Sequence, residues 1–360
     1  MSRRDDESTV GGVGMRVVVT GATGNVGTAV VRALDADERI DEIVGLARRV
    51  PGSTEDLPAK ARYVAADVVD DDLSTHVDGA DAVIHLAWMI QPSHRPLVTW
   101  RANVVGSQRV FEAVAAARVP ALVHASSIGA YSPGPADGRP VDESWPTHSL
   151  PTASYGREKA YVERLLDVFE RDQPACRVVR LRPAFIFQRP AATEQRRLFL
   201  GPFVPGSLMG RGRLPVVPLP ARLHFQTVHA DDVADAYRRA VVGDVRGAFN
   251  VAADPPLGAD DLAEVLGTRP VEVPPRLVRA LAAATWRLHL QPTEPELLDL
   301  FLALPTIDTD RARRELGWVQ TRTAGAALGE LTAGLSTGAG GSTPPLAADR
   351  IDRRVREVVQ

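Results

Sequence analysis

Tyr155 and Lys159 are the residues of this chain that are best suited to move a proton. Helical periodicity through Val168 places both side chains on one face of a helix. A phenol with an unperturbed pKa of about 10 is a poor base at neutral pH, but a nearby ammonium stabilises the phenolate and lowers that pKa. Such a pair is also common on helix surfaces. Only two of the 42 basic residues are lysines, however, so a lysine here predicts a specific role.

Two serines supply a second feature that supports a catalytic group. Ser126 and Ser127 directly follow an apolar run at residues 121–125, which predicts a β-strand. Ligands of open α/β sheets bind beyond the carboxyl ends of the strands, where a hydroxyl can orient a substrate oxygen toward Tyr155. We therefore predict that Ser127 acts with Tyr155 and Lys159. The alternatives are that Ser126 acts, or that both serines only end the strand.

A glycine-rich stretch, TGATGNVG at residues 20–27, stands between a β-branched run and a helical pattern. Gly21 permits a tight turn, Gly24 lets backbone amides approach a phosphate, and Gly27 lets the helix pack close to the strand. The helix N-terminus adds partial positive charge. An isolated match of this kind can be an ordinary turn, but the flanking patterns favour a dinucleotide-binding turn. No Gly-Lys-Ser/Thr sequence follows, which disfavours a P-loop.

The ends of the next two predicted strands bear on which coenzyme binds. An acidic residue after the second strand would bind the ribose hydroxyls of NAD, whereas arginine favours the 2′-phosphate of NADP. Ala47 and Arg48 stand there, so NADP is favoured, with NAD as the alternative. Arg48 on a solvated loop is the competing interpretation. Asp67, after the third strand, is placed either to meet the adenine or to cap a turn.

The elements that must hold these residues alternate between strand and helix patterns. Further strands are predicted at residues 42–46, 62–66, 81–86, 121–125 and 177–181. The alternation predicts an α/β fold with a Rossmann-type doubly wound parallel sheet and a smaller C-terminal α/β substrate lobe. The dinucleotide-binding domain is expected over residues 15–183, with 225–252 returning to it, the substrate lobe over 184–224 and 253–335, and flexible tails over 1–14 and 336–360.

Composition excludes several classes of function. The net charge is −3, with no long Lys/Arg run, so nucleic acid is a poor candidate partner. No apolar run approaches the ~20 residues that a membrane span requires, and we expect a cytoplasmic protein. The lone Cys176 reads as a buried strand thiol. His85, His124 and His229 fall in strands without metal-ligand spacing, so no metal site is predicted.

These ordered motifs resemble the extended short-chain dehydrogenase/reductase superfamily, in its NAD-dependent epimerase/dehydratase branch. Residues 20–27 resemble the family's TGxxGxxG, and Tyr155 with Lys159 its YxxxK. Ser127, four residues before Tyr131, matches the catalytic Ser/Thr. Further matches are residues 81–87 (D-x-V-x-H-L-A), 103–107 (N-x-x-G-[ST]), 181–183 (L-R-P), 228–233 (V-H-V-x-D-V) and 311–318 (R-x-x-x-x-L-G-W).

The resemblance implies a role for each matching residue. Ser127 should polarise the substrate oxygen, and Tyr155 should donate or take the proton. Lys159 should lower the tyrosine pKa and hold the nicotinamide ribose, and Asn103 should support a proton path. The positions predicted to bind the coenzyme are Gly21, Thr23, Gly24, Asn25, Val26, Gly27, Arg48, Asp67, Val68, Leu86, Ala87, Tyr155, Lys159 and Pro183. A homodimer through helices on the flank of the sheet is also implied.

The chain departs from the pattern of nucleotide-sugar epimerases. Ala184-Phe185 and Phe225 stand near the places of their asparagine and arginine, although Arg211, Arg213 or Arg222 could substitute. An apolar loop here indicates a less charged substrate. We expect an NAD(P)-dependent oxidoreductase acting on a carbonyl or secondary alcohol of a small, partly apolar molecule. The alternatives are a nucleotide-sugar epimerase or dehydratase with recycled NAD, and a non-catalytic dinucleotide sensor.

Overall fold

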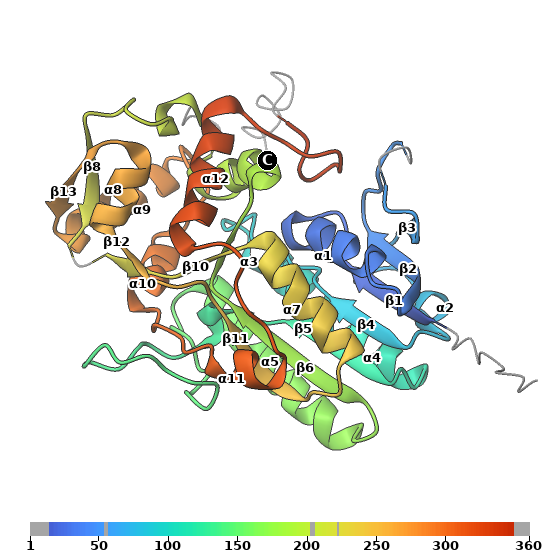
Figure 1. The fold of residues 1–360 in the computed structure, drawn as a ribbon. Helices are drawn as coiled ribbons and strands as arrows, with labels where there is room; N and C mark the ends of the chain where they lie inside the picture. The colour runs from blue at the N-terminus through green and yellow to red at the C-terminus, as the bar shows by residue number, and fades with distance from the viewer. Residues whose placement is uncertain (1–13, 54–56, 202–205, 222, 349–360) are drawn as a thin grey trace, which may run out of the picture.

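The structure is a computed structural model that describes residues 14–53, 57–201, 206–221 and 223–348. At its centre is a seven-stranded sheet in the order β11-β6-β5-β4-β1-β2-β3, with parallel pairing throughout (Figure 1). The strands are β1 (Met15–Thr20), β2 (Ile40–Ala47), β3 (Ala61–Ala65), β4 (Ala82–His85), β5 (Ala121–Ala125), β6 (Arg177–Pro183) and β11 (Gly247–Val251). The strand order reverses between β1 and β4, which confirms the predicted Rossmann-type doubly wound α/β fold.

Helices cover both faces of the sheet, so its central strands are apolar on both sides. In β1, Val17, Val18 and Val19 are fully buried. Val17 and Val19 belong to the core on the side of α1 and α7, and Val18 to the core on the side of α4 and α5 (Figure 1). These helices are α1 (Asn25–Asp35), α4 (Gly106–Ala116), α5 (Ser154–Asp172) and α7 (Ala230–Val242).

A smaller lobe is built from the chain that follows β6 and β11, and its helices α8, α9 and α10 lie beside the end of the sheet (Figure 1). Its strands form short pairs, β7 with β10, β9 with β12 and β8 with β13. Its strands are β7 (Phe185–Phe187), β8 (Val216–Pro220), β9 (His224–Phe225), β10 (Thr227–His229), β12 (Leu257–Gly258) and β13 (Arg269–Val273). The remaining helices are α2 (Ser74–Val77), α3 (Pro96–Trp100), α6 (Ala192–Gln195), α8 (Ala259–Leu266), α9 (Pro275–Arg287), α10 (Pro295–Ala303), α11 (Asp310–Glu315) and α12 (Ala324–Thr337).

The C-terminal segment corrects one expectation. Flexibility was predicted from residue 336 on, but α12 continues to Thr337 and residues 338–348 pack on the body of the protein. Leu346 is 2% exposed, and the Thr343 hydroxyl donates a hydrogen bond to the Thr23 carbonyl at 2.7 Å. Two well-placed side chains and backbone hydrogen bonds order a segment whose composition indicates flexibility. The other predicted tail positions, 1–13 and 349–360, lie outside the described residues.

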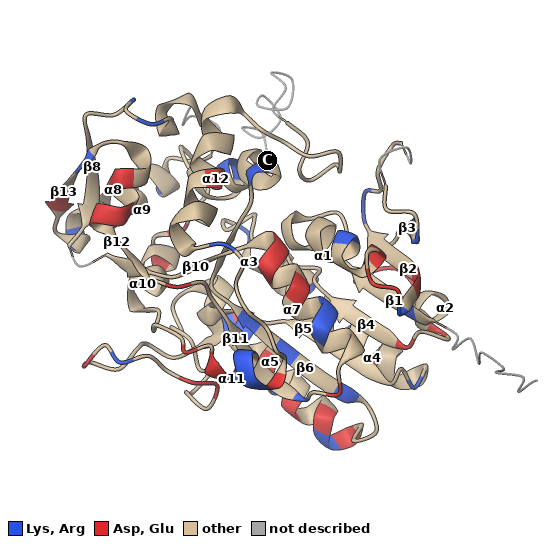
Figure 2. Ribbon diagram, in the orientation of Figure 1, with Lys and Arg blue, Asp and Glu red and all other residues tan. Residues whose placement is uncertain are grey.

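Charged side chains of both signs alternate on the outer helices. On α7, Asp235 pairs with Arg238 and Arg239, and Figure 2 shows this mixture on α7 and α11. Among the described residues, no helix combines the length and apolarity needed to cross a membrane.

Candidate active site

Ser127 and Tyr155 meet at the carboxyl end of β5. Ser127 follows β5 and begins a 3₁₀ turn, in which its Oγ accepts a hydrogen bond from the Gly129 amide at 3.0 Å. Tyr155 lies in the first turn of α5, and its ring and the Ser127 hydroxyl both lie against Gly129. Gly129 permits this approach, because a Cβ at that position would lie 2.8 Å from Cε1 of Tyr155. The structure thus brings together two of the residues predicted to be catalytic.

Lys159 lies one helical turn further along α5, beside the same tyrosine. Its Nζ donates a hydrogen bond to the Ala125 carbonyl at 2.7 Å and stands 3.4 Å from the centre of the Trp88 ring. The centre of the Tyr155 ring is 5.9 Å from this ammonium. Only 4% of Lys159 is exposed. The predicted spacing of four therefore does place ammonium and phenol on one face of the helix.

The pKa of the phenol differs from the expectation. We expected the Lys159 ammonium to lower it, but burial raises the pKa of Tyr155, and the hydrogen bond with Ser127 offsets this effect only in part. Burial also lowers the pKa of Lys159 to about 7, against the opposing charges of Glu163 and Glu158. The reason is that both groups lie in an apolar interior that disfavours either charged form.

Ser126 points away from this group. Its hydroxyl donates to Oε1 of Glu163 at 2.6 Å, and Glu163 is fully buried between Arg180 and Arg182. Ser126 thus takes part in a buried ionic cluster between α5 and β6. Of the two candidate serines, it is Ser127 that lies beside Tyr155 at Gly129.

Asn103 lies in a π-helical turn, Arg101–Val105, next to the catalytic group. Its Nδ2 donates to the Met89 carbonyl at 2.8 Å and to Oε2 of Glu158 at 2.6 Å, and its Oδ1 accepts from the Met89 amide at 2.7 Å. Met89 belongs to the segment that follows β4, and Glu158 directly precedes Lys159 on α5. In the structure Asn103 therefore ties the segment after β4 to α5.

The glycine-rich turn has the geometry that a phosphate requires. Gly21 has a φ of +71°, and a Cβ there would lie 2.8 Å from the Ala87 amide nitrogen. A Cβ at Gly27 would lie 2.2 Å from the Gly21 carbonyl oxygen. At Gly24 the nearest atom would be 3.6 Å away and the φ is an ordinary −80°. The fold itself thus requires the first and third glycines, and the second leaves open space at the N-terminus of α1.

Glu194 is a partly buried carboxyl group near this helix N-terminus. Burial raises the pKa of Glu194 to about 7, and the positive charge of Arg197 offsets this rise only in part. The partial positive charge of the helix N-terminus favours an anion in the open space beside Gly24. Residues of this turn fit the pyrophosphate of a dinucleotide.

The rest of the turn is held by polar contacts from the small lobe. Asn25 Nδ2 donates to the Ile186 carbonyl at 3.1 Å, and Gln188 Nε2 donates to Oδ1 of Asn25 at 2.9 Å. Thr23 is buried and Val26 half-buried beside them. The turn and the chain after β6 therefore form one wall.

The predicted coenzyme residues on β2 and β3 lie at the same edge of the sheet. Arg48 is exposed directly after β2. Oδ1 of Asp67 accepts from the Val69 amide at 2.9 Å, so Asp67 caps a turn, the second of its two predicted roles. Val68 packs beside Gly106 of α4.

The residues predicted after β4 and β6 complete this edge. The Leu86 amide donates to the Thr20 carbonyl at 3.1 Å, and the Ala87 amide to the Thr20 hydroxyl at 3.3 Å. Pro183 ends β6 and is buried opposite Val251. The carboxyl ends of β1, β4 and β6 thus lie at the same edge of the sheet as that of β5, where Lys159 bonds to the Ala125 carbonyl.

Apolar side chains of the small lobe pack against the tyrosine. Tyr155 shares a cluster with Leu297, Leu300 and Phe301 of α10, and with Phe199. The rings of Phe301 and Phe185 meet edge to face, with 5.0 Å between their centres. Beyond the catalytic group the surroundings are therefore aromatic and aliphatic. Of the arginines considered as substitutes, Arg211 and Arg213 are exposed beside α8, and Arg222 lies outside the described residues.

The residues predicted to belong to the core are buried. His85 bonds to the hydroxyls of Thr20 and Ser107 at 2.7 and 2.9 Å, and burial lowers its pKa to about 3. His124 and Cys176 are buried as well. Within the described ranges, no three His, Cys, Asp or Glu side chains form a metal-binding group.

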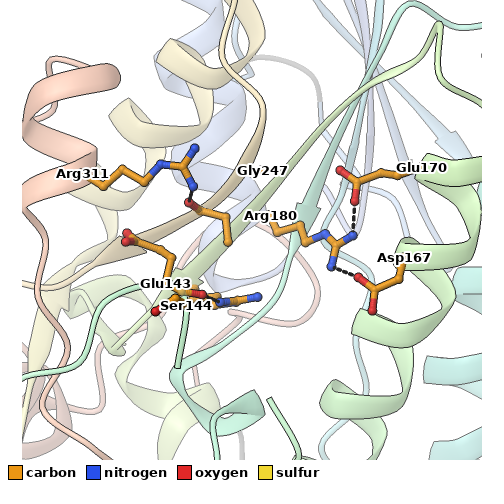
Figure 3. A pocket seen from close by; sticks show the side chains of 9 residues that line it. Glu143, Ser144, Asp167, Glu170, Arg180, Gly247 and Arg311 are labelled. Atoms are coloured by element: carbon orange, nitrogen blue, oxygen red, sulfur yellow. Dashed lines mark hydrogen bonds and ion pairs between the residues drawn. The ribbon is translucent and has the colours of Figure 1, made fainter. Parts of the chain in front are cut away.

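A cavity of about 360 Å³ at the β11 edge of the sheet is separate from this site. Figure 3 shows Arg180 there, bonded to Asp167 and Glu170 of α5, with Glu143 and Arg311 on the opposite side. Acidic and basic groups offset one another along its wall. Ser127, Tyr155 and Lys159 are not among the residues that line it.

Sequence reasoning missed three residues of the site. Trp88 covers Lys159, Glu194 lies at the start of α1, and Thr343 binds the glycine-rich turn. Trp88 directly follows the recognised L-A of the β4 motif, so its position was a signal. Glu194 and Thr343 lie in segments without a strong periodic pattern. Their neighbouring residues give no indication that they lie near Asn25 and Thr23 of the glycine-rich turn.

Comparison with known proteins identifies the family. The model of the NAD-dependent epimerase/dehydratase family matches residues 17–252. The chain belongs to this family. The match confirms the resemblance drawn from the motifs, and members of the family are NAD-dependent enzymes.

Relatives in the family include both a reductase and epimerases. A ketoreductase of Stigmatella aurantiaca, named for 4-hydroxy-2-methyl-3-oxo-4-farnesyl-3,4-dihydroquinoline-1-oxide, is 31% identical over 182 residues, which is 48% of this chain and 51% of that protein. UDP-glucose 4-epimerase of Streptomyces lividans is 32% identical over 158 residues, 42% of this chain and 46% of that protein. The chain thus spans about half the length of the curated relatives it matches.

Solved structures of epimerases share the fold. UDP-glucose 4-epimerase of Thermotoga maritima, in complex with UDP-glucose, superposes with a TM-score of 0.68 at 20% identity, covering 90% of this chain and 99% of that one. The Thermus thermophilus enzyme in complex with NAD gives a TM-score of 0.65 at 20% identity, covering 89% and 99%.

Proposed function

We propose that this chain is an NAD(P)-dependent oxidoreductase that interconverts a carbonyl and a secondary alcohol, with Tyr155 as the acid/base. The observation that carries the proposal is that Ser127 and Tyr155 lie together against Gly129, one helical turn from the buried ammonium of Lys159. Bound at the glycine-rich turn, a nicotinamide dinucleotide would supply the carbon that gives or accepts hydride. Family membership supports this reading.

The chain's own residues handle the substrate oxygen and its proton. Ser127 holds that oxygen beside Tyr155 through its hydroxyl. Because its raised pKa keeps the Tyr155 phenol protonated at neutral pH, the phenol is suited to give its proton to the oxygen during reduction. In oxidation it takes the proton back. When charged, Lys159 favours the phenolate and is placed to bind a ribose hydroxyl.

For the coenzyme, we propose NADP over NAD. Arg48 is exposed directly after β2, where the adenosine ribose binds in this fold. A guanidinium there can form a charge-assisted ion pair with the 2′-phosphate of NADP. With the neutral 2′-hydroxyl of NAD it forms no ion pair.

For the substrate, we propose a small, partly apolar molecule. Phe199, Leu297, Leu300 and Phe301 surround the tyrosine, and such a wall excludes water from an apolar ligand. Arg211 and Arg213, which would neutralise a diphosphate, lie exposed beside α8 and outside this cluster.

Nucleotide-sugar epimerisation is the second candidate, and the epimerase relatives favour it. It uses the same Ser, Tyr and Lys group but keeps its nicotinamide bound and recycled. Purified protein that retains NAD, and whose unfolding temperature rises with a UDP- or dTDP-sugar, would favour this candidate.

A homodimer is also proposed. Apolar side chains are exposed on adjoining helices of one flank: Leu97 is 81%, Tyr161 45% and Val168 46% exposed. Contiguous exposed apolar residues of this kind mark protein contacts. Light scattering of the purified chain at micromolar concentration should give twice the monomer mass.

The decisive experiment follows nicotinamide absorbance with a panel of ketones and aldehydes, using wild type and Tyr155→Phe. We expect turnover of at least one apolar carbonyl by the wild type, with NADPH used faster than NADH. The phenylalanine variant should bind coenzyme and lose at least about 10²-fold in turnover. Full activity of the variant would show that Tyr155 is not the acid/base.

A further inference from the structure

Trp88 covers the catalytic lysine in a way that the proposed chemistry does not by itself require. The Lys159 ammonium stands 3.4 Å from the centre of the indole ring. The same ring meets Tyr155 edge to face, with 6.0 Å between ring centres. Trp88 thus touches both residues of the YxxxK motif. A cation in front of an indole face is attracted by the ring's negative quadrupole, most strongly where water is excluded.

The burial of Lys159 makes this attraction matter. The side chain is 4% exposed, so its charge loses nearly all contact with water. Among the residues that the structure describes, Nζ donates one hydrogen bond, to the Ala125 carbonyl at 2.7 Å. An ammonium has three donors, so one carbonyl satisfies it only in part. The indole face supplies a second favourable contact.

The titratable groups around the lysine come from α5, β4 and β5. Glu158 and Glu163, both on α5, favour its charged form. His85 on β4 and His124 on β5 face it, and the pKa of each is lowered by burial, so both are neutral and do not repel it. The carboxylate of Glu163 is shared with two arginines of β6, which weakens its pull on the ammonium.

The backbone on each side of this contact is tied together. Asn103 bonds the amide and carbonyl of Met89, the residue after Trp88, at 2.7 and 2.8 Å. The same amide group donates to Glu158, the residue before Lys159, at 2.6 Å. One side chain thus fixes the spacing between the chain that carries the indole and the helix that carries the ammonium.

We propose that Trp88 is a positioning residue for Lys159, whose ring face holds the ammonium charged and in place beside Tyr155. The inference rests on the proposed function, in which a charged Lys159 acts on phenol and coenzyme. It adds that the aromatic residue after the β4 motif is part of this machinery, and that Asn103 serves it by anchoring Met89.

The test uses the fact that the chain has only two lysines, Lys60 and Lys159. Protein labelled with ¹³C at lysine Cε gives one signal from each, and their shifts are followed against pH without coenzyme. In wild type we expect the Lys159 signal at high field because of the ring current. In Trp88→Leu that displacement should vanish and the titration midpoint should fall by about one pH unit. Lys60 serves as the internal reference.

Two further variants complete the experiment. Trp88→Phe keeps a weaker ring and should lie between wild type and the leucine variant. Trp100→Phe is the matched control: Trp100 packs against Tyr161, with ring centres 4.9 Å apart, and both lysine signals should stay unchanged. Unchanged Lys159 shift and midpoint in the leucine variant would overturn the proposal. If that variant does not fold, the same result in Trp88→Phe overturns it.

Failure of this inference is distinguishable from failure of the proposed function. The lysine signals report on the protein without coenzyme or substrate, so they do not depend on turnover. If Trp88→Leu leaves them unchanged while Tyr155→Phe abolishes activity, only the role of Trp88 is wrong. If Trp88→Leu shifts them and Tyr155→Phe remains active, the tryptophan holds the lysine but the acid/base assignment is wrong.

Discussion

The Thr343 hydroxyl donates a hydrogen bond to the Thr23 carbonyl at 2.7 Å, across 320 positions of sequence. Thr23 belongs to the glycine-rich turn, and Thr343 to the segment that follows α12. Arg197 also donates to the carbonyls of Pro345 and Ala347 in this segment. The C-terminal segment is thus held both by the glycine-rich turn and by Arg197, in the chain that follows α6.

Removing the Thr343 hydroxyl should loosen that segment. We expect Thr343→Val to weaken coenzyme binding several-fold, because a buried carbonyl of the turn loses its donor, at a cost of about 1–3 kcal/mol. Fluorescence titration with NADPH measures it. Thr337→Val is the control, since the Thr337 hydroxyl bonds only to carbonyls of its own helix. Equal affinity in both variants would contradict the prediction.

Substitution of the two neighbouring serines should have different effects, on activity for Ser127 and on stability for Ser126. Ser127→Ala is expected to lower kcat by about 10²-fold or more, because the substrate oxygen loses its hydrogen-bonding partner, with little change in unfolding temperature. Ser126→Ala should keep most of kcat but destabilise the fold by about 1–2 kcal/mol, because it leaves Glu163 with one partner fewer. Steady-state kinetics and thermal unfolding of both variants check this. If instead Ser126→Ala lowered kcat and Ser127→Ala mainly lowered the stability, Ser126 would be the serine that binds the substrate oxygen.

Glu163 predicts a pH dependence of stability. Although burial alone would raise it, Arg182 and Arg180 hold the pKa of Glu163 at about 2, below the ordinary 4.5. Because folding lowers the pKa of this carboxyl group, its ionised form stabilises the folded protein at pH values above the unfolded-state pKa of about 4.5. This contribution is lost as the pH falls from about 4.5 to 2. Glu163→Gln should therefore cost about 3 kcal/mol at pH 7 and progressively less below pH 4.5. Urea unfolding at several pH values measures it, and a pH-independent difference would contradict the assignment.

Arg48 should set the choice of coenzyme. Arg48→Ser removes the guanidinium after β2, and we expect the NADP/NAD ratio of kcat/KM to fall by at least about tenfold. Arg62→Ser is the control, because its guanidinium pairs with Glu42 on the neighbouring strand. An unchanged ratio would mean that Arg48 remains a solvated side chain when coenzyme binds.

Much of the fold could be predicted because its patterns are local. Fewer than ten consecutive residues form each of the buried strands β1, β5 and β6, and the same holds for the glycine-rich turn. The alternation of strands and helices then predicts a parallel sheet covered by helices. The approach of Ser127 to Tyr155 followed, since both lie at the carboxyl edge. For this reason local patterns were enough to predict that Ser127, Tyr155 and Lys159 lie close together.

What sequence reasoning missed depends on distant or electrostatic relations. The order of residues 338–348 comes from hydrogen bonds of Ala339 and Thr343 with residues more than a hundred positions away, against a composition that indicates flexibility. The pKa of Tyr155 is raised by burial of its phenol, which spacing on a helix does not reveal. Glu194 reaches the start of α1 through a segment without periodicity.

The central claim is that the open space before Gly24 receives the pyrophosphate of a nicotinamide coenzyme. A Cβ at Gly24 meets only the Gly21 carbonyl oxygen, 3.6 Å away, and the backbone there is ordinary, so Gly24→Val should fold with an unfolding temperature close to wild type. Calorimetric titration with NADPH and NADH tests the claim most directly. We predict one site per chain in the wild type and at least a hundredfold loss of affinity in folded Gly24→Val. No binding by the wild type, or equal binding by the variant, would contradict it.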